Sequence, residues 1–141
     1  MLVQPRLYFQ GKCKEAIDFY RMALDAELVF EKPIGANANP AYIKPGTEDK
    51  ILQAALRIGE SVILVSDGHC AGTPAFQGFS LSVSIASEER AKKIVACLAD
   101  RGTIPIPLQK TAWAGIFGTV VDKFGVHWTI KVSTASREVD R

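Results

Sequence analysis

The sequence predicts an α+β protein in which one βαβββ module is followed by a second. Three observations lead to this prediction. The order of one strand, one helix and three strands runs once up to about Ser66, and again from Phe79 to Val132. The helix of each half carries apolar residues at helical spacing. Each half also ends in two strands joined by a tight turn. The two halves agree in pattern more than in residue identity, and the loop from Gly35 to Asp49 lengthens the first.

The elements of the first module are predicted from the spacing of its apolar residues and from the residues that interrupt regular structure. Ile17, Tyr20 and Leu24 recur at helical spacing, and the loop after the second strand is too rich in Asn, Pro and Gly to be regular. A Gly59-Glu60 turn joins the last two strands. The predicted elements are a strand at 3–9, a helix at 13–25, and strands at 27–34, 50–58 and 61–66.

The second module has clearer helix signals. Ser87 is a favourable N-cap, a buried stripe ends at Leu98, and Gly102 is expected to stop the helix. A turn over 122–125 joins the last two strands. The predicted elements are a strand at 79–85, a helix from 88 to 98, and strands near 103–108, 115–121 and 126–132. The expected organisation is a single domain over 1–141, with module one at about 1–66, a connector at 67–78, module two at about 79–132 and a C-terminal tail at 133–141.

Composition excludes several classes of partner. The formal charge is +2, from 17 basic and 15 acidic residues, and the basic residues form no run that would bind nucleic acid or a membrane surface. No apolar run approaches the roughly 18 residues that span a bilayer, and the first residues do not have the pattern of a secretion signal. Three widely spaced cysteines, Cys13, Cys70 and Cys97, suit reduced thiols. We therefore expect a soluble, cytoplasmic protein.

Strict alternation in the strand at 79–85 assigns its two faces. Phe79, Leu81, Val83 and Ile85 face one way, towards the helix, while the three serines between them face the other way. By the same logic His127, Thr129 and Lys131 lie on the side of these serines. Hydroxyl groups fit the wall of a hydrated or ligand-filled concavity better than a second apolar core. The alternative is a solvent-exposed sheet face.

Short motifs are spread through both modules and carry a family resemblance. They are Gly11-Lys12-Cys13, Glu15-Ala16-Ile17, Phe19-Tyr20, Leu24-Asp25-Ala26-Glu27, Ala55-Leu56-Arg57-Ile58-Gly59, Ser66-Asp67, Gly78-Phe79, Trp113-Ala114, Phe117-Gly118 and Val121-Asp122-Lys123-Phe124-Gly125-Val126-His127-Trp128. With these residues the chain resembles the vicinal oxygen chelate superfamily, which includes glyoxalase I, extradiol dioxygenases and bleomycin-resistance proteins. More narrowly it resembles the PhnB-like branch. The resemblance implies a single glyoxalase-like domain, a curved mixed sheet around a central pocket, and a homodimer.

The resemblance also allows a test of the metal site. Enzymes of this superfamily typically hold one divalent metal with His, Glu or Gln from the first and last strand of each module. Those positions map to Gln4 (or Pro5), Leu64, Ser80 and Thr129. Leu64 has no donor atom, and the two hydroxyls are weak ligands. We therefore predict no metal and no other cofactor, with a divalent metal at a displaced site left open.

Eight residues are candidates for contact with a small-molecule ligand. They are Gln4, Gln53, Arg57, Ser80, Ser82, Trp113, His127 and Thr129. Some PhnB-like relatives carry histidine at the place of Gln53. Trp113 is expected either to cover the pocket mouth or to seal the end of the sheet. Asp67 and Asp122 are expected to be turn residues whose side chains bond nearby backbone amides.

Three functions remain open from the sequence. The first is a metal-independent protein that sequesters a small molecule in a pocket between the modules. The second is a lyase, isomerase or dioxygenase-like enzyme that uses a relocated metal or His127, Gln53 or Arg57. The third is a structural or regulatory homodimer with a vestigial pocket. No catalytic residue is assigned, because neither a phosphate-binding loop nor a nucleophile elbow occurs.

Overall fold

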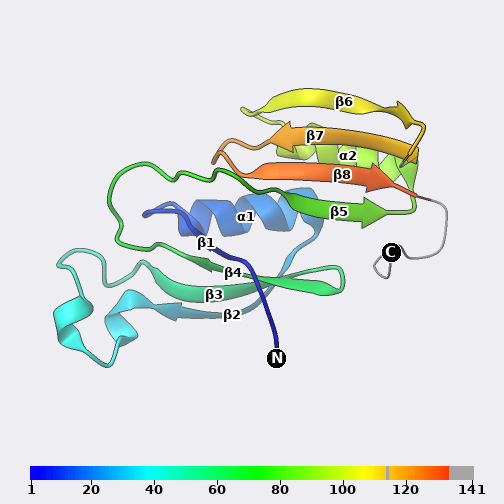
Figure 1. Cartoon of the computed structure of the whole chain (residues 1–141). Coiled ribbons are helices and arrows are strands. Elements are labelled where there is room, and N and C mark those ends of the chain that lie inside the picture. Colours follow the sequence, from blue (N-terminus) through cyan, green and yellow to red (C-terminus); the bar gives the residue numbers. More distant parts are fainter. Residues whose placement is uncertain (114, 134–141) are drawn as a thin grey trace. The chain divides into compact units, whose positions relative to one another are not determined.

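A computed structural model describes residues 1–113 and 115–133 of the chain. Within these residues the chain has two α-helices and eight strands, and it divides into two compact units, Met1–Pro74 and Ala75–Arg141 (Figure 1). The strands form two four-stranded mixed sheets, one in each unit. The predicted α+β class with two βαβββ modules is confirmed. The division falls inside the predicted connector at 67–78, and the single-domain organisation stays a prediction.

The first unit contains one helix, four strands and two 3₁₀ turns. The elements are β1 (Arg6–Tyr8), α1 (Cys13–Leu24), β2 (Glu27–Pro33), η1 (Ile34–Ala36), η2 (Pro40–Tyr42), β3 (Ile51–Ile58) and β4 (Ser61–Ser66). Helix α1 packs along β2 and β3. It buries seven side chains, among them Ile17, Tyr20 and Leu24. Burying each large apolar side chain stabilises the fold by roughly 1.5–3 kcal/mol.

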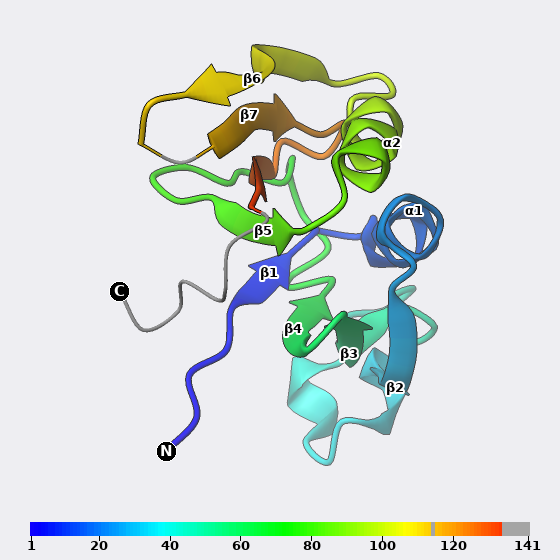
Figure 2. The same ribbon diagram turned by 90° about the vertical axis from the view of Figure 1, so that its right-hand side faces the viewer.

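The second unit repeats this order. Its elements are β5 (Leu81–Ile85), α2 (Glu88–Leu98), β6 (Thr103–Thr111), β7 (Gly115–Val121) and β8 (His127–Val132). Helix α2 lies on one face of the sheet against β5, β7 and β8 (Figure 2). The predicted stripe of Ala91, Ile94, Val95 and Leu98 is its buried side. Ser87 caps the helix as predicted, since its Oγ accepts a hydrogen bond from the N–H of Arg90 at 3.1 Å.

The two sheets share one topology, which confirms the internal repeat. The strand order is β1-β4-β3-β2 in the first sheet and β5-β8-β7-β6 in the second. In each sheet the first and last strands of the module pair in parallel, and the other neighbours are antiparallel. Arg6 lies opposite Leu64 in the first sheet, and Ser82 lies opposite Thr129 in the second. Leu64 and Thr129 therefore each lie on the last strand of their module, opposite a residue of its first strand.

Helix α1 ends one residue before the predicted limit, whereas α2 ends at Leu98 as predicted but without the stop expected at Gly102. Helix α1 stops at Leu24, because Asp25 adopts a left-handed conformation with φ 53°. In the second unit the left-handed residue after α2 is Arg101, with φ 58°, and not Gly102. Gly102 is needed for another reason, since a Cβ there would collide with the carbonyl oxygen of Val121. This glycine permits a close approach of two backbones.

Several strand limits are also corrected. The first strand covers Arg6–Tyr8 only, because it has a single partner in β4. The strand predicted from residue 79 starts at Leu81, and β6 continues to Thr111 through its pairing with β7. The loop at 35–49, expected to be irregular, includes the end of η1 and the whole of η2, both short 3₁₀ turns. Among the described residues, neither helix is long and apolar enough to cross a membrane.

Candidate binding face of the second sheet

The second sheet has one face against α2 and one face turned away from it. Trp128, Ile130 and Val132 of β8 are buried on the α2 side, whereas His127 is exposed and Thr129 half-buried on the other. We call this other side the hydroxyl face. Its residues, taken from alternation and register, are Ser82, Ser84, Phe117, Thr119, His127, Thr129 and Lys131.

The centre of the hydroxyl face is a row of three hydroxyl side chains. Thr129 lies opposite Ser82 on one side and opposite Thr119 on the other. Directly opposite side chains in a sheet lie about 4.5–5.5 Å apart at Cβ. Ser80, just before β5, joins this row, because its Oγ lies 3.0 Å from Oγ1 of Thr129. Each hydroxyl has one donor hydrogen and two lone pairs, so the pair retains capacity for further hydrogen bonds.

An aromatic pair lies next to the hydroxyl row. Phe117 is in β7, two residues from Thr119 and opposite Lys131. The ring of Trp113 packs against Phe117 with a centroid distance of 5.1 Å and an interplanar angle of 58°. Trp113 is 73% exposed, so most of its surface remains accessible in the chain as described. Whether it covers or seals a pocket stays a prediction.

His127 stands at the opposite end of β8 from Lys131. It is the first residue of the strand, lies opposite Val121 and is exposed. The structure thus brings together five of the candidates on one sheet face or its borders, namely Ser80, Ser82, Trp113, His127 and Thr129.

The remaining three candidates belong to the first unit. Gln53 accepts a hydrogen bond through Oε1 from Nη2 of Arg6 at 2.6 Å. Arg57 forms an ion pair with Glu27 at 3.4 Å, with both side chains largely exposed. Such a pair contributes little to stability. Gln4 precedes β1 and is half-buried. Gln53 and Arg57 therefore both already bond to residues of the first sheet.

Each unit contains one buried aspartate whose carboxylate accepts hydrogen bonds from residues of the same unit. The carboxylate of Asp122 accepts hydrogen bonds from the N–H groups of Phe124 and Val126 and from the indole Nε1 of Trp128, at 2.9–3.0 Å. This confirms its prediction as a turn residue. The prediction for Asp67 is wrong, because its side chain binds distant amides.

Asp67 connects the start of α1 to the start of β3. Its Oδ1 accepts from the N–H of Cys13 at 2.8 Å, and its Oδ2 accepts from the N–H of Ile51 at 2.6 Å. The carboxylate is fully buried. The first amides of a helix have no partner within the helix, so Asp67 satisfies one of them from a remote strand end. The sequence signal for turns could not distinguish this role from a local one.

Cys13 and Cys70 are not poised as nucleophiles. Cys13 is fully buried, and burial, with Asp67 and Glu31 adding to it, raises the pKa of its thiol far above the ordinary value. The pKa of Cys70 is also raised, mainly by burial and then by Asp67. A thiol held protonated is a poor nucleophile and metal ligand. His69, next to Cys70, is exposed as expected.

The inherited metal positions do not fit a divalent ion. The first unit offers Gln4 and Leu64, and the second offers Ser80 and Thr129, whose hydroxyls bond each other. An amide, a hydrocarbon and two neutral hydroxyls lack the carboxylate or imidazole donors that such ions need. Among the described residues no group of three or more His, Cys, Asp or Glu is arranged as a metal site.

Comparison with known proteins gives the family. Residues 2–131 match the family model described as 3-demethylubiquinone-9 3-methyltransferase. The chain belongs to this family. Protein YjdN of Escherichia coli (strain K12) is 36% identical over 140 residues, which are 94% of this chain and 95% of that protein.

Solved structures agree with the PhnB-like assignment. Protein PA1353 from Pseudomonas aeruginosa has a TM-score of 0.81 at 30% identity, covering 94% of this chain and 98% of that one. The putative 3-demethylubiquinone-9 3-methyltransferase, PhnB protein, from Bacillus cereus has a TM-score of 0.78 at 27% identity, covering 94% and 100%. A glyoxalase-related enzyme from Fulvimarina pelagi, at 17% identity and a TM-score of 0.61 over 94% and 88%, shows the shared fold alone. The predicted PhnB-like resemblance is confirmed.

Four residues that the structure places beside the candidate residues of this PhnB-like chain were not identified from the sequence. Arg6 and Glu27, the partners of Gln53 and Arg57, come from strands distant in sequence. Phe117 and Thr119 were also missed. The available signal was the alternation in β7, where Gly118 and Val120 are buried and the residues on either side of each are not.

Proposed function

We propose that this PhnB-like protein binds a small organic molecule on its hydroxyl face without a divalent metal ion. The observation that carries the proposal is the hydroxyl row of Ser82, Thr129 and Thr119, extended by the 3.0 Å contact between Ser80 and Thr129. This row includes a position where the superfamily resemblance expects a metal ligand. Neutral donors and acceptors at that position suit direct hydrogen bonding to a ligand.

The composition of the face supports a ligand over a second apolar core. Covering hydroxyl groups with hydrocarbon removes their water without replacing its hydrogen bonds, which is unfavourable. A ligand with oxygen atoms supplies those bonds, and each contributes about 0.5–1.5 kcal/mol. The neighbouring Trp113 and Phe117 rings add apolar contact area. Small-molecule sites typically combine aromatic surface with a small number of polar groups.

The first sheet contributes weaker support. Gln53 uses only its carbonyl oxygen towards Arg6, so its two amide N–H donors remain suited to a ligand. Arg57 and Gln4 are kept as further candidates for ligand contact. We infer from the resemblance that the protein works as a homodimer, and from its composition that it works in the cytoplasm. Light scattering at micromolar concentration tests the dimer, and a monomer would refute that part.

A thermal-shift screen in paired buffers tests the proposal. One buffer contains EDTA, and the other contains added zinc or manganese. A ligand at 100 times its Kd stabilises the folded state by about 2.7 kcal/mol, which raises the melting temperature of a chain this size by roughly 5–10 °C. We expect equal shifts in both buffers. Shifts that require the metal, or near-stoichiometric metal in the untagged protein, contradict the proposal.

Two variants locate the binding. Thr129→Val keeps the shape of the side chain and removes its hydroxyl, so the ligand-induced shift should shrink. Thr73→Val makes the same change at an exposed residue outside the strands of the first unit and should leave the shift intact. Equal effects of both variants would place the binding elsewhere.

Enzymatic activity is the second candidate. The family description and the B. cereus relative both name methyl transfer. The screen therefore includes S-adenosylmethionine, and transfer of its methyl group to a screened phenol would favour an enzyme. The lyase, isomerase or dioxygenase alternative would need a relocated metal or His127, Gln53 or Arg57. His127 belongs to the second unit, whereas the other two belong to the first and are already engaged.

A further inference from the structure

We infer that the ligand of the hydroxyl face is a flat heterocycle that carries an amide group within its ring. The ring stacks on Trp113, and its adjacent N–H and C=O groups pair with the side-chain carboxamide of Gln109. The inference rests on the proposed function and deepens it by naming the class of ligand. Three features of β6 and β7 support it.

The first feature is the position of Gln109. This residue of β6 lies directly opposite Phe117 of β7, and opposite residues of an antiparallel pair project to the same side of a sheet. Gln109 therefore projects to the same side as the hydroxyl face, and it is exposed. Among the described residues its carboxamide forms no hydrogen bond. Its oxygen and its NH2 group are both available to a ligand.

The second feature is a bulge in β6 that turns Gln109 to this side. Ile106 pairs with Thr119. Gln109 comes three residues later but pairs with Phe117, which is only two residues from Thr119. In a regular strand two residues three apart face opposite sides, and the extra residue of the bulge reverses this. A Cβ at Gly118 would lie 2.9 Å from the carbonyl oxygen of Ile106, so a glycine accommodates the bulge. Bulges often redirect a side chain next to a functional site.

The third feature is the aromatic surface beside Gln109. Trp113 packs against Phe117 with a centroid distance of 5.1 Å and is still 73% exposed. A flat ring placed on Trp113 removes apolar surface from water, and aromatic pairs gain beyond the area that they bury. Opposite side chains lie about 4.5–5.5 Å apart at Cβ, so the edge of a ring at Phe117 is within reach of Gln109.

The hydrogen-bonding groups of a carboxamide favour a ring amide as partner. The oxygen of Gln109 accepts and its nitrogen donates. A ring amide presents an N–H and a C=O group side by side, so two parallel hydrogen bonds form, as when glutamine pairs with the edge of adenine. A carboxylate has no donor for the glutamine oxygen. Lys131, on the other side of Phe117, already has an interaction within the chain, so no anion is assigned to it.

Three matched probes test the inference. The first, 6-hydroxy-2-quinolone, has the ring amide and, on its far ring, a hydroxyl group for the row of Thr119 and Thr129. Its N-methyl derivative lacks the N–H group, and 6-hydroxy-2-naphthoate has a carboxylate in place of the ring amide. Binding to the ¹⁵N-labelled full chain is followed by NMR, which also detects the side-chain NH2 group of Gln109. The indole signal of Trp128, which is buried and donates to Asp122, reports that the fold is intact.

We expect the quinolone to shift the side-chain NH2 signals of Gln109, the indole N–H signal of Trp113 and the backbone amide signal of Thr129. The N-methyl derivative and the naphthoate should bind about tenfold more weakly, because they lose hydrogen bonding to Gln109. If either of them binds as tightly as the quinolone, the inference is overturned.

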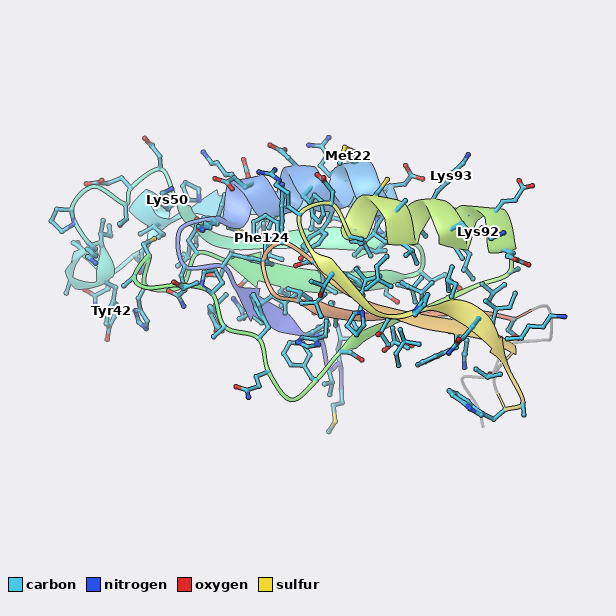
Figure 3. The ribbon with its side chains drawn as sticks, turned by 90° about the horizontal axis from the view of Figure 1, so that it is seen from above. Met22, Tyr42, Lys50, Lys92, Lys93 and Phe124 are labelled. Carbon is cyan, nitrogen blue, oxygen red and sulfur yellow. The ribbon has the colours of Figure 1, made fainter. Side chains whose placement is uncertain are left out.

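Variants assign each part of the recognition. Gln109→Leu should weaken binding of the quinolone about tenfold and affect the N-methyl derivative less. Gln77→Leu is the matched control, because Gln77 is exposed and lies outside the strands of the second unit. Trp113→Leu should weaken binding of all three probes. Tyr42→Leu is its control, since Tyr42 is equally exposed, at 73%, in the first unit (Figure 3).

The results separate failure of the inference from failure of the proposed function. If another compound of the screen moves the amide signals of Thr119 and Thr129 and the quinolone does not, the ligand class is wrong and the binding proposal stands. If no compound moves these signals, both are wrong. If Gln109→Leu and Gln77→Leu have equal effects on binding of the quinolone, the assignment of the ring amide to Gln109 is wrong.

Discussion

Replacing Asp122 should lower the free energy of unfolding more than replacing most other polar residues. Its carboxylate is 3% exposed and accepts three hydrogen bonds within the turn between β7 and β8, from Phe124 N, Val126 N and Trp128 Nε1. The three donors come from a turn, a strand entry and a core side chain. Asp122→Ala removes the acceptor of all three at once, while the two backbone donors and the buried indole of Trp128 stay in place.

The size of the loss follows from this geometry. A buried donor left without an acceptor costs about 1–3 kcal/mol. Water entering at the turn is expected to replace one of the three bonds, so two orphaned donors remain and the loss is about 4 kcal/mol. Asp122→Asn keeps one oxygen for the two backbone amides and turns an N–H group towards the indole of Trp128. It should therefore cost less, about 2 kcal/mol.

A double-mutant cycle isolates the indole bond. Urea unfolding, followed by far-UV circular dichroism, gives the free energy of unfolding of Asp122→Asn in the wild type and in Trp128→Phe. The cavity left by the smaller phenylalanine ring is present in both Trp128→Phe and the double variant, so its cost cancels when their free energies of unfolding are subtracted. Because no indole donor remains there, Asp122→Asn should cost at least about 1 kcal/mol less than in the wild type.

Two results would refute this reasoning. The first is an equal cost of Asp122→Asn in both backgrounds, which would mean that the indole bond adds nothing. The second is an Asp122→Ala variant within about 0.5 kcal/mol of the wild type, the range typical of surface substitutions. Ser84→Ala, at an exposed strand position, serves as the control for a surface change.

Four further predictions concern stability. Asp67→Ala removes the acceptor of two buried amides, one of them that of Cys13, and should lower the free energy of unfolding by about 2–4 kcal/mol in urea. Gly102→Ala should cost about 2 kcal/mol or more, because its Cβ meets the Val121 carbonyl; a wild-type melting temperature would contradict this. Ser87→Ala should cost about 1 kcal/mol through the lost cap, again measured in urea. Burial raises the pKa of Cys13 above its unfolded value near 9.0, so the unfolded thiol ionises first and stability is lost above about pH 9, at roughly 1.4 kcal/mol per pH unit. Cys13→Ala should flatten that part of the pH profile of urea unfolding, and an unchanged slope would refute the assignment.

Most of the fold was predictable from local patterns. The stripe at Ala91, Ile94, Val95 and Leu98 needed only helical spacing, and the cap at Ser87 only its residue type. The ends of elements were harder, because they depend on partners distant in sequence. The first strand is limited by its pairing with β4, and Gly102 is required by the approach of another strand and not by the helix before it.

The candidate residues were predictable as faces but not as contacts. Alternation placed Ser82 and Thr129 on one side of the second sheet, and their register confirms it. Alternation could not show that Gln53 bonds Arg6, because β1 and β3 pair through β4, which lies between them. The same limit explains Asp67, whose partners lie 16 and 54 residues away.

The repeat separates the residues that make the fold from those available for binding. Both modules have the same topology, and both bury apolar side chains between helix and sheet. The faces turned away from the helices are under no such constraint and carry different residues in the two modules. On the last strand of each module, opposite its first strand, Leu64 in the first sheet is hydrocarbon and Thr129 in the second is a hydrogen-bonding group. Because the polar side chains Gln53 and Arg57 already bond within their own sheet, recognition of a ligand should depend mainly on the second module.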